Sequence, residues 1–270
     1  MDYSKVISVV YEASKFVFSK EIKAVNKDGN PNDFVTAVDI AISDFVKAEL
    51  KKDFPDVGFV TEEEREHAYA KKSFILDPID GTTNLVFDYK LSSVSLAYQE
   101  DGQVKFGVVY NPFSKELFFA IKGKGSYLYV VENGLADLFN VGVENYTDNC
   151  LKVSDRALAN SIIEFGANVS DKSLADLSFE RGKRVYKNCL DLRRTCSSAI
   201  AICYIACGRL DGYFEQKLKP WDYAAATLIL EEAGGKSCDF DGDKLPLDRN
   251  SSIICANAVI LEELKKLVVG

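Results

Sequence analysis

Hydrophobic residues recur along the chain with two different spacings. Over residues 3–19 they fall three or four positions apart, which predicts an amphipathic helix, and residues 34–50 predict a second one after an extended entry. In the middle of the chain the pattern changes to short apolar runs, separated by the turn pairs Asp101-Gly102 and Asn111-Pro112. These runs, at residues 94–99, 104–110 and 116–121, predict three strands of an antiparallel meander.

The last third of the chain alternates helical and extended patterns. Residues 197–207 predict a helix that ends at Gly208, residues 211–215 a short strand, and residues 222–233 a helix that ends at the pair Gly234-Gly235. A turn cluster at 27–32 interrupts the first third, but the chain shows no linker, repeat or low-complexity segment. Helices and strands in successive blocks predict a layered protein of the α+β class.

Composition and charge narrow the class of protein. With 270 residues, 47% of them hydrophobic and 27% charged, the chain can form one large globular domain or two closely packed ones. The formal net charge of −8 and the absence of long Lys or Arg runs disfavour nucleic-acid binding by charge alone, so a small ligand is expected. No membrane association is expected. If that ligand is anionic, cations must neutralise it locally.

Cysteine and histidine usage restricts the chemistry further. The seven cysteines form no C-x-x-C pair, and the first 25 residues lack the apolar stretch of a signal peptide, so we expect reduced thiols and a cytoplasmic location. Cys203 and Cys207 can share a helix face, where small apolar packing is expected rather than a metal site. His67 is the only histidine, which excludes a multi-histidine zinc site, and it lies in a polar run typical of the surface.

The strongest chemical signal is residues 76–84 (LDPIDGTTN), which follow the apolar residues 74–76. Two carboxylates, a glycine and a threonine at the point where a buried strand gives way to a loop suit a hard cation and the phosphate that it neutralises. The alternative is an Asp-Pro and Asp-Gly turn that caps a helix at Thr82 or Thr83.

Two further acidic positions fall near the ends of predicted elements. Glu62 to Glu64 follow the apolar residues 57–60, and Asp222 follows Pro220-Trp221. Taken singly, the glutamates are typical of a solvated charge run and Asp222 of a helix N-cap. What favours a chemical role for these residues and for the aspartates of residues 76–84 is that they all coincide with the motifs of one family.

Several segments, in order along the chain, resemble the inositol monophosphatase family. They are residues 32–39 (NDFVTAVD), 61–63 (TEE), 77–84 (DPIDGTTN), 107–112 (GVVYNP), 208–215 (GRLDGYFE), 221–225 (WDYAA) and 231–235 (EEAGG). Two long motifs at the right separation are far more specific than a lone glycine-rich loop. The resemblance implies a layered α-β-α-β-α sandwich formed by a single domain, residues 1–270. Within it, a metal-binding half would cover about residues 1–150 and a smaller α/β half about residues 151–270.

The resemblance also implies a Mg²⁺-dependent phosphomonoesterase, commonly a homodimer, with two or three ions in each active site. Glu62, Asp77 and the Ile79 carbonyl would hold one Mg²⁺. Asp77, Asp80 and Asp222 would hold a second, and the shared Asp77 anion would reduce the repulsion between the two cations. Inhibition by lithium is expected because Li⁺ could replace the second Mg²⁺.

Catalytic and substrate-binding roles follow from the same resemblance. Thr82 with Asp39 would position and deprotonate a water bound in the site that Glu62 completes, and the water would attack phosphorus in line. Asp39 on its own could equally be an ordinary helix residue. The residues expected to contact the substrate are Asp80, Gly81, Thr82, Cys196, Ser197, Ser198, Glu215 and Asp222.

Substrate choice rests on fewer residues. Glu215 fits a polyol phosphate such as inositol monophosphate, but Cys196 and Ser198 replace a glycine and an alanine of the family pattern. Residues 129–149 form a longer segment than is usual, and 165–170 differ from the usual lid, so we expect an altered substrate range. Fructose 1,6-bisphosphate, a 3′-phosphonucleotide and histidinol phosphate are alternative substrates. A non-enzymatic alternative is a binding partner in RNA or transcription complexes.

Overall fold

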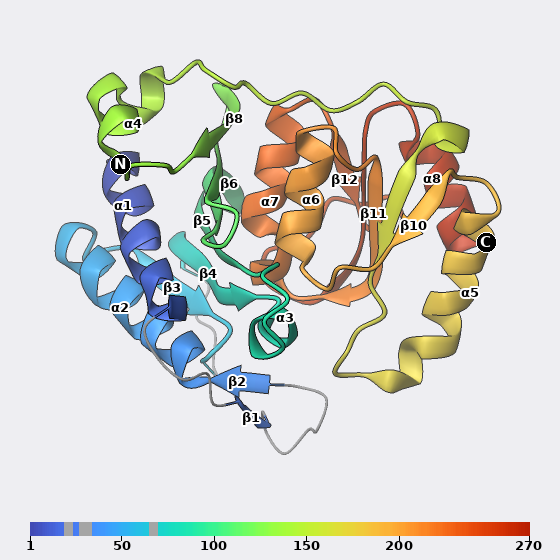
Figure 1. Ribbon diagram of the computed structural model, residues 1–270, viewed down its shortest axis with the longest axis horizontal. Coiled ribbons are helices and arrows are strands. Elements are labelled where there is room, and N and C mark those ends of the chain that lie inside the picture. Colours follow the sequence, from blue (N-terminus) through green and yellow to red (C-terminus); the bar gives the residue numbers. More distant parts are fainter. Residues whose placement is uncertain (19–23, 27–33, 65–69) are drawn as a thin grey trace.

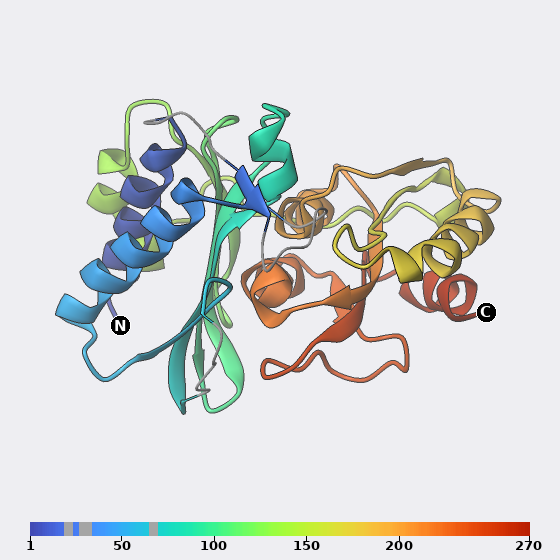
Figure 2. The ribbon, with the colours of Figure 1, turned by 90° about the horizontal axis from the view of Figure 1, so that it is seen from below.

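The described elements of the protein form five layers in the order helix, sheet, helix, sheet, helix (Figure 2). The computed structural model describes residues 1–18, 24–26, 34–64 and 70–270. The predicted turn at 27–32 and His67 therefore lie outside the described residues. The order of the layers confirms the fold class predicted from the sequence.

The first helical layer contains α1 (Tyr3–Ser14), which continues as the 3₁₀ turn η1 (Lys15–Phe18), and α2 (Ala37–Asp53). The predicted start of the second helix at residue 34 is wrong, because residues Phe34–Thr36 form the short strand β2, paired with β1 (Ala24–Asn26). The helix begins after Thr36 because the Thr36 hydroxyl accepts hydrogen bonds from the Val38 and Asp39 N–H groups.

The second layer is a six-stranded sheet whose strands follow their order in the sequence. It contains β3 (Gly58–Thr61), β4 (Lys72–Asp80), β5 (Ser93–Glu100), β6 (Gln103–Asn111), β7 (Glu116–Ile121) and β8 (Gly125–Val130). Only β3 and β4 are parallel, so the predicted meander of β5, β6 and β7 is confirmed. One expectation is corrected: Asp77 and Asp80 belong to β4 itself and not to a loop after it.

The segment 129–149 folds onto the outer side of this sheet. It includes α4 (Ala136–Val141) and the 3₁₀ turn η3 (Val143–Asn145), and its buried residues Leu138 and Tyr146 join the core formed by α1, α2 and the sheet. None of its residues lines the pocket described below. The structure therefore gives no support to the expectation that this segment alters the substrate range.

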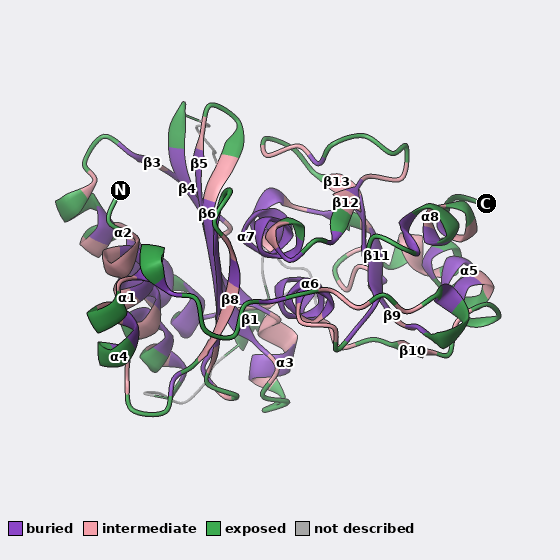
Figure 3. Ribbon diagram, turned by 90° about the horizontal axis from the view of Figure 1, so that it is seen from above, coloured by how far each residue is buried: buried purple, intermediate pink, exposed green. Residues whose placement is uncertain are grey.

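The middle layer consists of α6 (Ser198–Ala206) and α7 (Pro220–Glu232), which lie between the two sheets (Figure 1). Both are almost entirely buried, and Cys203 belongs to this core as the sequence suggested (Figure 3). The helix α7 approaches β6 so closely that a Cβ atom on Gly107 would lie 2.6 Å from the Ala225 carbonyl oxygen. Only glycine fits at this contact.

The fourth layer is a five-stranded sheet in the order β10 (Asp191–Arg193), β9 (Ile162–Phe165), β11 (Gly212–Leu218), β13 (Ser251–Ala256), β12 (Lys236–Cys238). The strand predicted at 211–215 is thus longer than expected. The outer helices α5 (Ala175–Tyr186) and α8 (Leu261–Val269) cover the far face of this sheet. The short helix α3 (Thr82–Val86) and the 3₁₀ turns η4 (Leu158–Asn160) and η5 (Lys172–Leu174) complete the described elements.

The structure also bears on the state of the cysteines and on membrane-spanning helices. All seven cysteines are free thiols. Among the described helices, none is both long and apolar enough to cross a membrane.

Candidate active site

A pocket of about 340 Å³ lies where β4, α3 (Thr82–Val86), α6 and the end of β11 meet. Its lining includes all but one of the site residues named from the sequence. These are Glu62, Asp77, Ile79, Asp80, Gly81, Thr82, Cys196, Ser197, Ser198, Glu215 and Asp222. The exception is Asp39, which does not line the pocket but accepts a hydrogen bond from the lining residue Thr82. The segment 165–170 also lines the pocket.

A bulge in β4 directs two carboxylates into this pocket. In a regular strand, residues three apart point to opposite faces of the sheet. Here the pairing with β5 shifts register between Asp77, opposite Ser95, and Asp80, opposite Ser93. The extra residue on β4 lets Asp77 and Asp80 both line the pocket.

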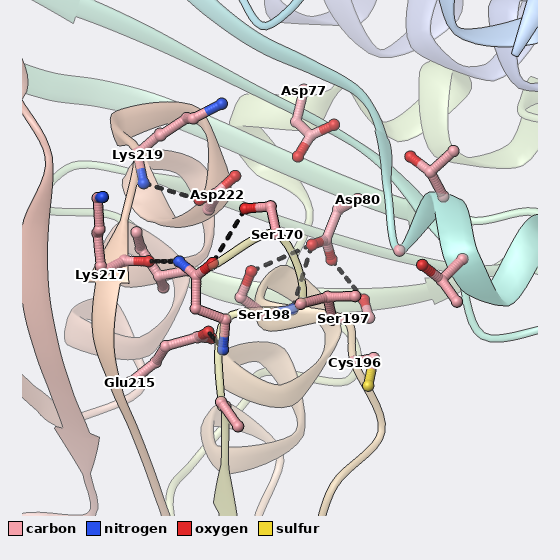
Figure 4. Close-up of a pocket in the computed structure, with 18 of the residues that line it drawn as sticks. Asp77, Asp80, Ser170, Cys196, Ser197, Ser198, Glu215, Lys217, Lys219 and Asp222 are labelled. Carbon is pink, nitrogen blue, oxygen red and sulfur yellow. Dashed lines mark hydrogen bonds between the residues drawn. The ribbon is translucent and has the colours of Figure 1, made fainter. Parts of the chain in front are cut away.

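Asp80 connects the two halves of the chain. Its carboxylate accepts hydrogen bonds from the Ser197 hydroxyl, from the Ser198 N–H and hydroxyl at 3.1 Å each, and from the Ala199 N–H at 3.0 Å (Figure 4). These groups belong to the first turn of α6, where backbone N–H groups have no partner within the helix. Asp80 therefore caps a helix that begins more than a hundred residues later, and the two serine hydroxyls expected to face the substrate bond to Asp80.

Asp222 enters the pocket from the first turn of α7. The residue is not the N-cap: the helix begins at Pro220, and the Asp222 carboxylate accepts a hydrogen bond from the Lys219 N–H at 2.7 Å (Figure 4). Of the glutamate run, Glu62 lines the pocket whereas Glu64 pairs with Lys47. The glutamates are therefore not simply a solvated run.

The acidic residues of the pocket destabilise one another's charged forms. Burial, and then repulsion by Glu62, Asp80 and Asp222, raises the pKa of Asp77. Burial raises the pKa of Asp80 to about 6, although its hydrogen bonds to Ser197 and Ser198 oppose the shift. Burial and the nearby Glu62 also raise the pKa of Asp222.

This set of donors fits a hard divalent cation. Its donors are carboxylate and carbonyl oxygens, which Mg²⁺ prefers over softer ligands. Among the described residues, no three acidic, histidine or cysteine side chains already stand close enough to form a metal cluster. Uncompensated carboxylates repel one another, and a bound cation would remove that repulsion.

Thr82 and Asp39 form a hydrogen-bonded pair at the edge of the pocket. The Thr82 hydroxyl lies 3.2 Å from Asp39 Oδ1 and 3.0 Å from the Ile79 carbonyl oxygen. The other oxygen of Asp39 accepts hydrogen bonds from the Thr36 N–H at 2.9 Å and the Thr36 hydroxyl at 2.5 Å. Burial raises the pKa of Asp39 to about 6 against these hydrogen bonds. Asp39 is thus a helix-capping residue whose second oxygen, Oδ1, accepts a hydrogen bond from Thr82.

Two hydrogen bonds hold the Glu215 carboxylate in place. Its Oε1 accepts a hydrogen bond from the Asn168 N–H at 2.9 Å, and its Oε2 accepts one from the Tyr213 hydroxyl at 2.5 Å. A Cβ atom on Gly166 would lie 1.9 Å from Glu215 Oε2, so only glycine allows this contact. The sequence analysis assigned no role to Asn168 or Tyr213, although Asn168 lies in the divergent segment 165–170 and Tyr213 in the motif at 208–215.

Asn84 is a third residue to which the sequence analysis assigned no role, although it ends the motif at 76–84. Its side-chain amide donates to the Leu91 carbonyl at 2.8 Å and to the Thr195 carbonyl at 2.7 Å. The amide therefore ties α3 to the loop that carries Cys196. In that loop Cys196 has a φ of 62°, in the left-handed region where glycine is favoured.

The layered fold and the acidic pocket match the expectation for a metal-dependent phosphatase of the sandwich type, and comparison with known proteins gives the family. The model of the inositol monophosphatase family matches residues 2–269. The chain is 34% identical over 238 residues to a Nus factor SuhB of Pasteurella multocida, covering 87% of this chain and 83% of that protein. It is 33% identical over 241 residues to an inositol-1-monophosphatase of Mesorhizobium japonicum, covering 88% and 84%.

A solved structure agrees with this assignment. The IMPase of Thermotoga maritima superposes with a TM-score of 0.83 at 28% identity, covering 99% of this chain and 95% of that one. The chain therefore belongs to the inositol monophosphatase family, whose members are metal-dependent phosphatases that typically use Mg²⁺.

Proposed function

We propose that this protein is a Mg²⁺-dependent phosphomonoesterase that hydrolyses inositol monophosphate, or a closely related polyol phosphate, to the alcohol and inorganic phosphate. The observation that supports it most directly is the hydrogen bond between Thr82 and Asp39, beside three aspartates that line one pocket, two of them buried. A proton acceptor next to a set of hard-cation ligands is what metal-assisted hydrolysis of a phosphate ester requires.

The metal ligands in this proposal are Glu62, Asp77, the Ile79 carbonyl, Asp80 and Asp222. Bound Mg²⁺ would supply positive charge that offsets the charge of the phosphate and lowers the pKa of a water molecule. Asp80 is held in place by its hydrogen bonds to the first turn of α6, and Asp222 by the Lys219 N–H. Both carboxylates are thereby positioned before a ligand arrives.

The proton of the attacking water passes to Thr82 and Asp39. The Thr82 oxygen accepts it while the Thr82 hydroxyl proton moves to Asp39 Oδ1, so the water oxygen can form a bond to phosphorus. As the ester bond breaks, the departing alcohol oxygen takes a proton from solvent water. Burial brings the pKa of Asp39 to about 6, which makes its carboxylate a better proton acceptor than an exposed aspartate. The Gly81 and Thr82 N–H groups bind the nonbridging phosphate oxygens in this proposal.

The test measures phosphate release from inositol 1-phosphate beside fructose 1,6-bisphosphate, a 3′-phosphonucleotide and histidinol phosphate, with Mg²⁺ and with a chelator. We expect release that depends on Mg²⁺ and is highest with the inositol ester. Preference for another ester would retain the metal chemistry and replace the substrate. No release from any ester, by folded protein, would overturn the proposal.

A single substitution can distinguish loss of the metal site from loss of the fold. Asp222→Asn keeps the size of the side chain but removes one anionic ligand, so we expect turnover to fall by a factor of at least about 100. Asp148→Asn, at an exposed position outside the pocket, is the matched control. Near-normal turnover of Asp222→Asn at millimolar Mg²⁺ would contradict the two-metal assignment.

A second candidate function is favoured by the names of relatives. Proteins called Nus factor SuhB are 34–36% identical to this chain, so we propose membership of a transcription complex as the alternative. Recovery of stoichiometric RNA polymerase with the purified protein, unchanged in Asp222→Asn, would favour it. If no RNA polymerase is recovered with the protein purified from its host organism, this alternative is wrong.

A further inference from the structure

Glu164 is a buried acidic residue on the wall of the pocket that none of the roles above uses. It lies on β9, opposite Tyr213 of β11 in the register of the sheet. Partners in register present their side chains on the same face, as do residues two apart on one strand. Glu164, Tyr213 and Glu215 therefore share one face of the sheet, and all three line the pocket.

The two carboxylate oxygens of Glu164 differ in their contacts. Oε1 accepts hydrogen bonds from the Thr195 N–H at 2.8 Å and from the Thr195 hydroxyl. Oε2 is buried and has no hydrogen-bond partner among the described residues, and Glu164 as a whole is only 2% exposed. A buried carboxylate oxygen without a donor is costly, and such atoms in native proteins call for an explanation.

The neighbouring glutamate, Glu215, has no carboxylate oxygen without a hydrogen-bond donor. Both oxygens of Glu215 already accept hydrogen bonds, from Asn168 and from Tyr213. The acceptor that remains without a donor on this wall is Glu164 Oε2. A ligand that fills the pocket can supply the missing donor.

The donor is better supplied by a neutral hydroxyl than by a cationic group. Burial raises the pKa of both Cys196 and Glu215, and the positive charge of Arg194 opposes each shift, so a cation already lies beside this wall. An additional ammonium on the substrate would meet that charge, whereas a hydroxyl would not.

We propose that Glu164 is a substrate-recognition residue whose Oε2 accepts a hydrogen bond from a hydroxyl of the phosphorylated polyol. This inference rests on the proposed function of the same pocket. Oε1 stays bonded to Thr195, so the carboxylate is held in one orientation when the substrate enters. Glu164 thereby selects esters that carry a hydroxyl within its reach over esters that lack one.

The test compares Glu164→Gln with Thr195→Val on two substrates. Glutamine can keep the hydrogen bonds from Thr195 through its carbonyl oxygen, but it places an NH₂ group where the free acceptor stands. We expect kcat/KM for inositol 1-phosphate to fall roughly 10- to 100-fold, mainly through KM, because a hydrogen bond to a charged group is lost. For p-nitrophenyl phosphate, which has no hydroxyl, we expect less than about a threefold change.

Thr195→Val removes one bond to Oε1 and leaves Oε2 unchanged. This variant measures the effect of loosening the loop around residue 195. We expect kcat/KM to change by the same factor for both substrates. Equal losses on both substrates in Glu164→Gln would assign Glu164 to the fold only and overturn the proposal. Unchanged kinetics on both substrates would do the same, as would a wild-type preference for histidinol phosphate that Glu164→Gln abolishes.

Failure of the proposed function can be told apart from failure of this inference. If the wild type releases phosphate from none of the esters, the phosphatase proposal is wrong. Calorimetry with inositol 1-phosphate and with inorganic phosphate then still tests Glu164. Weaker binding of the inositol ester alone in Glu164→Gln supports the inference, and equal binding by both proteins overturns it.

Discussion

Cys196 holds a left-handed backbone conformation that a side chain opposes. Its φ of 62° brings Cβ close to the neighbouring backbone, at a cost of about 1–2 kcal/mol for most residues other than glycine. Cys196→Gly removes this strain, so we expect the free energy of unfolding to rise by about 1 kcal/mol and the pocket wall to recede. Urea denaturation measures the first effect.

Cys196→Ala is the matched comparison, because alanine also lacks the thiol but keeps Cβ. We expect it to be no more stable than the wild type. If alanine stabilised the protein as much as glycine does, burial of the thiol and not the backbone would be the source of the cost. Burial also raises the pKa of the Cys196 thiol, so the thiol stays protonated at neutral pH.

Individual site residues could be named from the sequence where they lie in a contiguous motif. Asp77, Asp80 and Thr82 were found in this way, and the structure brings them into one pocket with Asp222. Glu164 was missed because it reaches the pocket only through the pairing of β9 with β11. A pairing between strands nearly fifty residues apart leaves no local signal in the chain.

At the scale of the elements, the position of the segment 166–171 depends on its close contact with Glu215. Gly166→Ala places a methyl group 1.9 Å from Glu215 Oε2, so either the segment or the carboxylate must move. We expect a loss of about 2 kcal/mol or more in the free energy of unfolding and a raised KM, measured by urea denaturation and steady-state kinetics.

Gly182→Ala on α5 is the control for this substitution. The added Cβ there would meet the ring of Phe165 at 3.4 Å, an ordinary contact, and alanine favours a helix. We expect a small gain in stability, about 0.5 kcal/mol. A loss at Gly182 as large as at Gly166 would show that the region, and not the Glu215 contact, is sensitive to any added volume.

The order and type of the long elements followed from periodicity, whereas their ends did not. The second helix starts at Ala37 and not at residue 34, because a side-chain cap decides where a helix begins. The strand β4 continues through Asp80 because a bulge keeps it paired with β5. Both features depend on a few hydrogen bonds that hydrophobic spacing does not report.

For the molecule as a whole, the buried acids make stability depend on pH and metal. The pKa of Asp80 is about 6 in the folded state against an ordinary 3.8, and the pKa of Asp77 is also raised. The folded state therefore binds protons more tightly than the unfolded state, and stability falls as pH rises from about 4 through 6. We expect metal-free protein to lose on the order of 2 kcal/mol between pH 5 and pH 7.5, and excess Mg²⁺ to restore it.

Asp77→Asn tests this expectation without changing the fold. The variant removes one buried charge, so in chelator at pH 7.5 we expect it to melt a few degrees above the wild type. We also expect it to respond less to Mg²⁺. Thermal melts with and without Mg²⁺ at the two pH values measure both effects. A wild type that is equally stable at both pH values without metal would contradict the argument.

The layered architecture could be predicted because blocks of helix and strand leave few ways to bury their apolar faces. The helical middle layer was implied by the family resemblance. That Asp80 caps α6 could not be inferred from either source, because the contact joins the first sheet to the middle helical layer across a long stretch of sequence.

The capping of α6 by Asp80 affects how the protein is made on the ribosome. Asp80 leaves the ribosome about 120 residues before the first turn of α6, and Asp222 follows some 20 residues later. At roughly 5–20 residues per second, the aspartates of β4 wait several seconds or more for their partners. During this interval the nascent chain has a nearly complete first sheet with an unfinished acidic pocket. Activity therefore begins only when the second half of the chain has folded against the first.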